Sequence, residues 1–210
     1  ALKPAAPAAT APAPSPAAAA PISLDPGGAT LADPAEVGKF TNAVAKTLID
    51  TSKIVRAAAP QDPIGYTLLR AALALTAKLP PITNGATTIP APPDALVREL
   101  ATHQERGNWD RLLLTCEVSL VGKRFWLDLH RLSALALTNL GKDFEAARDT
   151  VVAWTALWVK LYPAVIDATF AGGMPFASDV TKEWLAAEVM PSAGGGGGGG
   201  SETTEGSEAI

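Results

Sequence analysis

Apolar residues recur three, four and seven positions apart through most of residues 31–190, the spacing that places side chains on one face of an α-helix. The first series consists of Val37, Phe40, Val44, Leu48 and Val55. Asp33 precedes it as a candidate N-cap, followed by Pro34 at the first helical position and Glu36 as the reciprocal cap. This pattern predicts a long helix from Pro34 to about Ala59.

The same spacing, with start and stop signals, predicts further helices along the chain. Asp62 and Pro63 open the second helix, and Pro80 ends its segment. The later helices are expected at residues 93–107, 109–121, 124–140 and 143–161, and from Ser178 or Asp179 through Leu185. No segment alternates with period two for long enough to indicate a strand. We therefore predict an all-α fold, a compact bundle of about seven main helices.

A turn pattern repeats within this series of helices. The sequences GNWD and GKDF, which begin at Gly107 and Gly141, each follow one helix, open the next, and lie 34 residues apart. Thirty-four residues is the period of the tetratricopeptide repeat, but an array needs at least three repeats to bury its faces. The expectation is tetratricopeptide-like helical hairpins inside a globular bundle.

The two ends of the chain have compositions that cannot build a core. Residues 1–30 are mainly Pro and Ala, and residues 191–210 contain seven consecutive glycines followed by an acidic stretch. Such segments favour disordered linkers, the first semi-rigid and the second flexible. Residues 31–190 are accordingly expected to form the helical middle domain of a longer protein.

Charge, hydropathy and candidate chemistry exclude several classes of function. The net charge of −4 and the lack of a basic run argue against nucleic acid as a partner, and no apolar run is long enough for membrane insertion. His103, His130 and Cys116 have no metal-binding spacing, and no phosphate-binding glycine loop or serine-hydrolase motif is present. We predict no metal, no cofactor and no enzymatic activity, with Cys116 a buried structural thiol.

The stretch RFWLDLHR, residues 124–131, gathers the side chains that most resemble catalytic groups. On the predicted helix, Phe125 and Trp126 belong to the apolar stripe, while Asp128 lies four and three positions from Arg124 and Arg131. This spacing predicts ion pairs along the helix surface. Packing with a structural ion pair is the favoured interpretation, and a partner surface or a catalytic group are the alternatives.

The predicted helix at residues 143–161 is apolar nearly all round. Trp154, Trp158 and Leu161 lie along one of its faces. Such a helix is either central in its domain or covered by another chain. These three residues are therefore a candidate interface for self-association.

Three segments resemble the middle region of the TssA-like (ImpA/VasJ-type) proteins of the bacterial type VI secretion system. They are QDPIGYTLLRAAL at 61–73, the stretch from RGNWD to LTNLG at 106–141, and FAGGMPFASDVTKEWL at 170–185. The motif residues, which the resemblance implies are structural, are Arg124, Phe125, Trp126, Asp128, Arg131, Pro175, Phe176 and Trp184.

The resemblance implies a cytoplasmic assembly role, with baseplate, tube or sheath components of the secretion system as partners. The helical middle domain of such proteins lies between an N-terminal domain and a ring-forming C-terminal domain. It is associated with dimerisation. The alternative is a tetratricopeptide-like adaptor domain that binds an extended peptide in a concave groove.

Overall fold

The structure, a computed structural model, describes residues 34–190. Both predicted linkers and the candidate cap Asp33 lie outside this range. The seven α-helices of the described residues are α1 (Pro34–Ala58), α2 (Pro63–Leu75), α3 (Asp94–Glu105), α4 (Trp109–Ser119), α5 (Leu127–Leu140), α6 (Glu145–Leu161) and α7 (Asp179–Trp184). Short 3₁₀ segments η1 (Lys142–Phe144) and η2 (Pro163–Ile166) flank α6, and a π-helical turn, η3 (Leu185–Val189), continues α7. The predicted helical bundle is confirmed.

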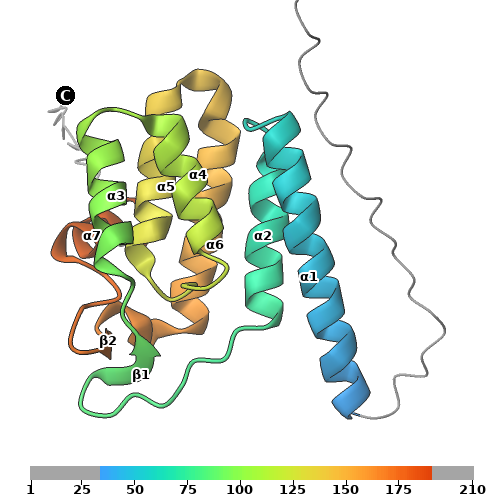
Figure 1. The fold of residues 1–210 in the computed structure, drawn as a ribbon, viewed down its shortest axis with the longest axis vertical. Coiled ribbons are helices and arrows are strands. Elements are labelled where there is room, and N and C mark those ends of the chain that lie inside the picture. Colours follow the sequence, from blue (N-terminus) through green and yellow to red (C-terminus); the bar gives the residue numbers. More distant parts are fainter. Residues whose placement is uncertain (1–33, 191–210) are drawn as a thin grey trace, which may run out of the picture.

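The helices pack largely in the order of the chain. Figure 1 shows α1 and α2 as a pair at one edge of the molecule, with α3 to α6 forming the remainder of the bundle. Gly107 and Gly141 adopt φ angles of 66° and 106° at the two hairpin turns, a region that favours glycine. The repeated turn pattern therefore marks two consecutive helical hairpins, α3–α4 and α5–α6.

Two short strands were not predicted. β1 (Ala86–Pro90) and β2 (Thr169–Ala171) pair in parallel, and the N–H of Thr169 donates to the carbonyl oxygen of Gly85 at 2.9 Å. The Thr87 hydroxyl donates to the carbonyl oxygen of Thr169 at 2.9 Å. A strand of three residues is too short to show alternation, so this pairing depends on the tertiary fold.

The core surrounds α5, which contacts α4, α6 and α7. Leu127, Leu129 and Leu137 of this helix are completely buried. Phe125 and Trp126 are 5% and 2% exposed, so they are buried as predicted although they precede the helix. Cys116 on α4 is also fully buried, which confirms its predicted environment; the remaining core is contributed mainly by α2, α6 and the segment before α7.

Candidate functional site

Two of the segments that carry the family resemblance meet at the start of α5. The N–H of Leu127 donates to the carbonyl oxygen of Phe176 at 2.7 Å, and the rings of Phe125 and Phe176 stack with centroids 6.2 Å apart. The N–H of Phe176 in turn donates to the carbonyl oxygen of Ala168 at 3.0 Å. The RFWLDL and PFA sequences thus form one packed unit, although about 50 residues separate them.

Asp128 is the polar centre of this unit. Its Oδ1 accepts hydrogen bonds from the backbone N–H and the hydroxyl of Ser178, at 2.9 and 2.8 Å, and from the hydroxyl of Thr181 at 2.5 Å. Its Oδ2 accepts from the indole N–H of Trp126 at 3.1 Å. A carboxylate is favoured at a helix N-terminus, so Asp128 caps α7 from a different helix.

The predicted ion pairs of Asp128 with Arg124 and Arg131 do not occur among the described residues. Arg124 precedes α5, because the helix begins at Leu127, so helical spacing does not relate it to Asp128. Its Nη1 instead donates to the Thr76 hydroxyl at 2.8 Å, at the C-terminal end of α2. Nε of Arg131 donates to the Thr181 hydroxyl at 2.9 Å. The motif arginines therefore join separate elements.

His130 is enclosed in the core beside the aromatic residues. Its Nε2 lies 3.4 Å from the carbonyl oxygen of Arg124, and its Nδ1 lies 3.4 Å from the hydroxyl of Thr155. Its ring centroid is 6.3 Å from that of Trp158. Burial lowers the pKa of His130 to about 3, so the imidazole is neutral near pH 7. A neutral, enclosed imidazole is suited to packing.

A buried ionic cluster connects α1, α2, α4 and α5. Glu117 is completely buried and accepts hydrogen bonds from both terminal nitrogens of Arg70, at 2.9 and 3.1 Å, and from the Ser133 hydroxyl at 2.8 Å. Nη1 of Arg56 lies 3.5 Å from the same carboxylate. Burial alone would raise the pKa of Glu117, but the two guanidiniums and the hydroxyl hold it below its usual value.

The candidate interface residues on α6 have different environments. Trp158 is 4% exposed and packs against Phe125 and Tyr162, with ring centroids 5.5 and 5.1 Å away. Trp154 is half-buried, whereas Leu161 is 54% exposed. Only Trp154 and Leu161 therefore present surface from which a partner can be contacted.

A family model described as "Type VI secretion, EvfE, EvfF, ImpA, BimE, VC_A0119, VasJ" matches residues 39–210. The chain belongs to this type VI secretion family. The match includes all three segments on which the resemblance was based. A comparison with curated proteins found no match.

In this type VI secretion protein the motif residues contribute unequally to the surface. Phe125, Trp126 and Phe176 are buried, whereas Pro175 is exposed and Trp184 is half-buried.

Within residues 34–190, no group of three or more His, Cys, Asp and Glu side chains is arranged to hold a metal. The helices of the same range are too short or too polar to span a bilayer.

The Glu117 cluster was missed in the sequence. The signal was present, because Glu117 directly follows Cys116 within an apolar helical run, where a carboxylate must find a buried partner. Its main partner, Arg70, lies 47 residues away on α2 in an equally apolar context. The sequence shows Glu117 and Arg70 as separate charged residues in apolar segments. Their pairing depends on how α2 packs against the rest of the bundle.

Proposed function

We propose that this chain is a non-catalytic assembly module of a type VI secretion system, which self-associates as a dimer in the cytoplasm. It connects an N-terminal domain with a ring-forming C-terminal domain, and its other partners are baseplate, tube or sheath components. The family match and the helical fold support the assembly role. The self-association is supported by the surface of α6.

The observation that carries the self-association is an apolar strip on the outer face of α6. Leu157 and Leu161 are 41% and 54% exposed, one turn apart, and Trp154 precedes Leu157 by three positions. Val151 and Trp158, on the adjoining part of the helix surface, lie in the core. Large aliphatic and aromatic side chains grouped on one exposed face are characteristic of protein interfaces.

The mass of the 210-residue chain tests this proposal by size-exclusion chromatography with light scattering. The wild-type chain is expected at twice the monomer mass of 21.5 kDa, and Leu161→Glu as a folded monomer, because an unpaired charge destabilises an apolar interface. Val118→Glu is the matched control, since Val118 is 56% exposed on α4. A wild-type monomer at high concentration, or a dimeric Leu161→Glu variant, would contradict the proposal.

A further inference from the structure

A cavity of about 170 Å³ lies at the end of the bundle where three turns of the chain approach one another. Figure 1 shows the α1–α2 turn, the start of α4 and the α5–α6 turn at the same end of the molecule. Apolar side chains make most of the cavity wall: Pro60, Tyr66, Leu113, Leu114, Leu140 and Phe144. An apolar cavity of roughly 150 Å³ can hold a six-carbon ring, so this one accommodates a single apolar side chain.

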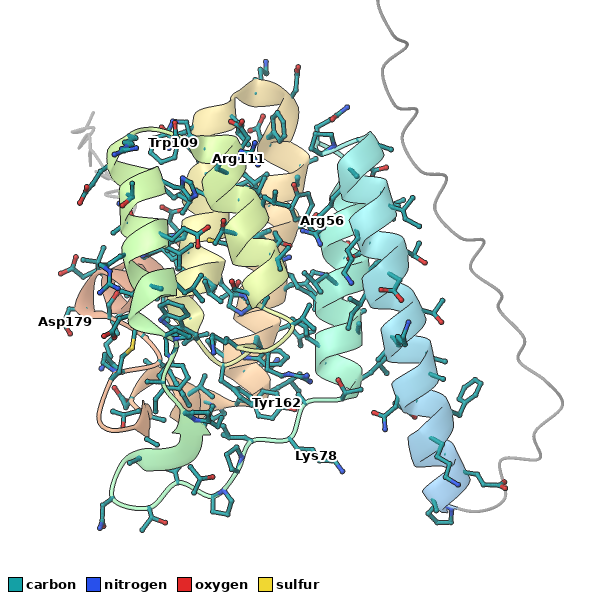
Figure 2. The ribbon with its side chains drawn as sticks, viewed as in Figure 1. Arg56, Lys78, Trp109, Arg111, Tyr162 and Asp179 are labelled. Carbon is teal, nitrogen blue, oxygen red and sulfur yellow. The ribbon has the colours of Figure 1, made fainter. Side chains whose placement is uncertain are left out.

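Arg56 supplies a cation to this wall. Figure 2 labels Arg56 between the α1–α2 pair and the remaining helices. Its guanidinium carbon lies 5.9 Å from the centroid of the Tyr66 ring, and its side chain is 11% exposed. The cavity therefore combines an apolar wall with one guanidinium.

The charge of Arg56 is only partly neutralised by its neighbours. Glu117 makes two short hydrogen bonds to Arg70, while its contact with Arg56 is longer, at 3.5 Å. Nη2 of Arg56 reaches the Ser52 hydroxyl at 3.4 Å, and its buried Nε has no hydrogen-bond partner among the described residues. Two guanidiniums thus share one buried carboxylate, which leaves part of a positive charge for another acceptor.

Asp110 is the other charged residue of the cavity wall. It is exposed in the first turn of α4, where water screens its carboxylate. Arg56 is mostly buried, and charge interactions at buried positions are screened less. An incoming anion is therefore attracted to Arg56 more strongly than it is repelled by Asp110.

We propose that this cavity binds the C-terminal residue of a partner polypeptide when that residue is apolar. The apolar side chain contacts Leu113, Leu114 and Phe144, and the terminal carboxylate accepts hydrogen bonds from Arg56. A single residue supplies both groups, which suits a cavity of this volume. An internal apolar residue leaves Arg56 without its acceptor, and an acidic side chain leaves the apolar wall unfilled.

The first experiment compares peptides that differ in one group. The 210-residue chain, with labelled leucine methyl groups, is titrated in NMR with N-acetyl-Gly-Gly-Leu as the free acid and as the C-terminal amide. The acid is expected to shift the methyl signals of Leu113, Leu114 and Leu140 saturably, with a dissociation constant of about 1 mM or tighter. The amide should bind about tenfold more weakly, because it lacks the charge. Equal binding of both, or no saturable shift with the acid, would overturn the proposal.

Three variants then locate the site. Leu114→Glu places a carboxylate on the cavity wall and is expected to weaken binding of the acid at least about tenfold. Val118→Glu, one turn further on the same exposed face of α4, is the control and should bind like wild type. Arg56→Gln should bring the affinities for acid and amide together. Equal affinity in Leu114→Glu and Val118→Glu would place the peptide elsewhere.

This inference does not depend on self-association. The cavity is lined by residues of α1, α2, α4, α5, η1 and the α1–α2 turn, and none of its lining residues belongs to the outer face of α6. Leu114→Glu is therefore expected to retain the mass of the wild-type chain while losing the peptide. Leu161→Glu should change the mass while keeping the peptide, so failure of either proposal is recognised separately.

Discussion

His130 illustrates how the environment of one residue determines its chemistry. The side chain is 2% exposed and its ring lies beside Trp158, while the nearby cation Arg70 adds to the effect of burial in lowering the pKa to about 3. The unfolded chain binds a proton at this residue near its ordinary pKa of 6.5. Between these two values the unfolded state alone is protonated, so His130 makes the free energy of unfolding depend on pH.

The sign of that dependence gives a prediction. Above pH 6.5 both states are neutral at His130, and as the pH falls toward 3 the unfolded state gains a proton that the folded state does not. The free energy of unfolding is therefore expected to decrease by about 2 kcal/mol between pH 7 and pH 5. Urea unfolding at fixed protein concentration measures it. The His130→Gln variant should lose this pH dependence, and the control variant His103→Gln should keep it. If His103→Gln lost the pH dependence and His130→Gln kept it, the dependence would belong to His103.

Asp128 shows the limit of spacing rules at the residue scale. The positions of Arg124 and Arg131 predicted ion pairs with Asp128, but the partners of its carboxylate are Ser178, Thr181 and Trp126. Helical spacing identifies neighbours on the same helix, whereas this side chain reaches residues 50 and 53 positions away. Contacts of that range follow from the return of the chain to the start of α5, which no local pattern encodes.

The α6 helix contains both a core tryptophan and a partly exposed tryptophan, which its sequence does not distinguish. Trp154 and Trp158 are one turn apart, yet Trp158 is in the core and Trp154 is half-buried. Trp158→Ala is expected to lower the free energy of unfolding by about 3–5 kcal/mol, because it leaves a cavity beside Phe125 and Tyr162.

Trp154→Ala is the matched variant and is expected to lower stability less, while weakening the dimer. Urea unfolding together with light scattering distinguishes the two effects. A folded, monomeric Trp158→Ala protein of nearly wild-type stability would show that Trp158 belongs to an interface.

Element boundaries were predictable where a local signal exists. Asp62 caps α2 as expected, since its carboxylate accepts from the N–H of Ile64 at 2.8 Å. The start of α5 was placed three residues early, because Arg124 has good helix propensity but its side chain binds the end of α2. Tertiary contacts override propensity at such positions.

At the scale of the whole molecule, α1 is held mainly by one other helix. It packs chiefly on α2, and only Ala45 and Ser52 among its residues are fully buried. Figure 1 shows its N-terminal turns extending past the C-terminal end of α2, where Val37 and Phe40 are 40% and 38% exposed. Its C-terminal half is held by the contact of Arg56 with Glu117. The free energy of local opening is therefore expected to rise along α1 toward its C-terminus.

Hydrogen exchange measured by mass spectrometry tests this gradient on the wild-type chain. Amides of residues 36–44 are expected to exchange at least about tenfold faster than those of residues 46–58, because local opening there exposes little buried apolar surface. Amides of α5, which contains the completely buried Leu127, Leu129 and Leu137, serve as the internal reference for slow exchange. Equal protection along the whole of α1 would contradict the gradient. Such protection would mean that Val37 and Phe40 are covered in solution, and the self-association surface would then have to include α1 as well as α6.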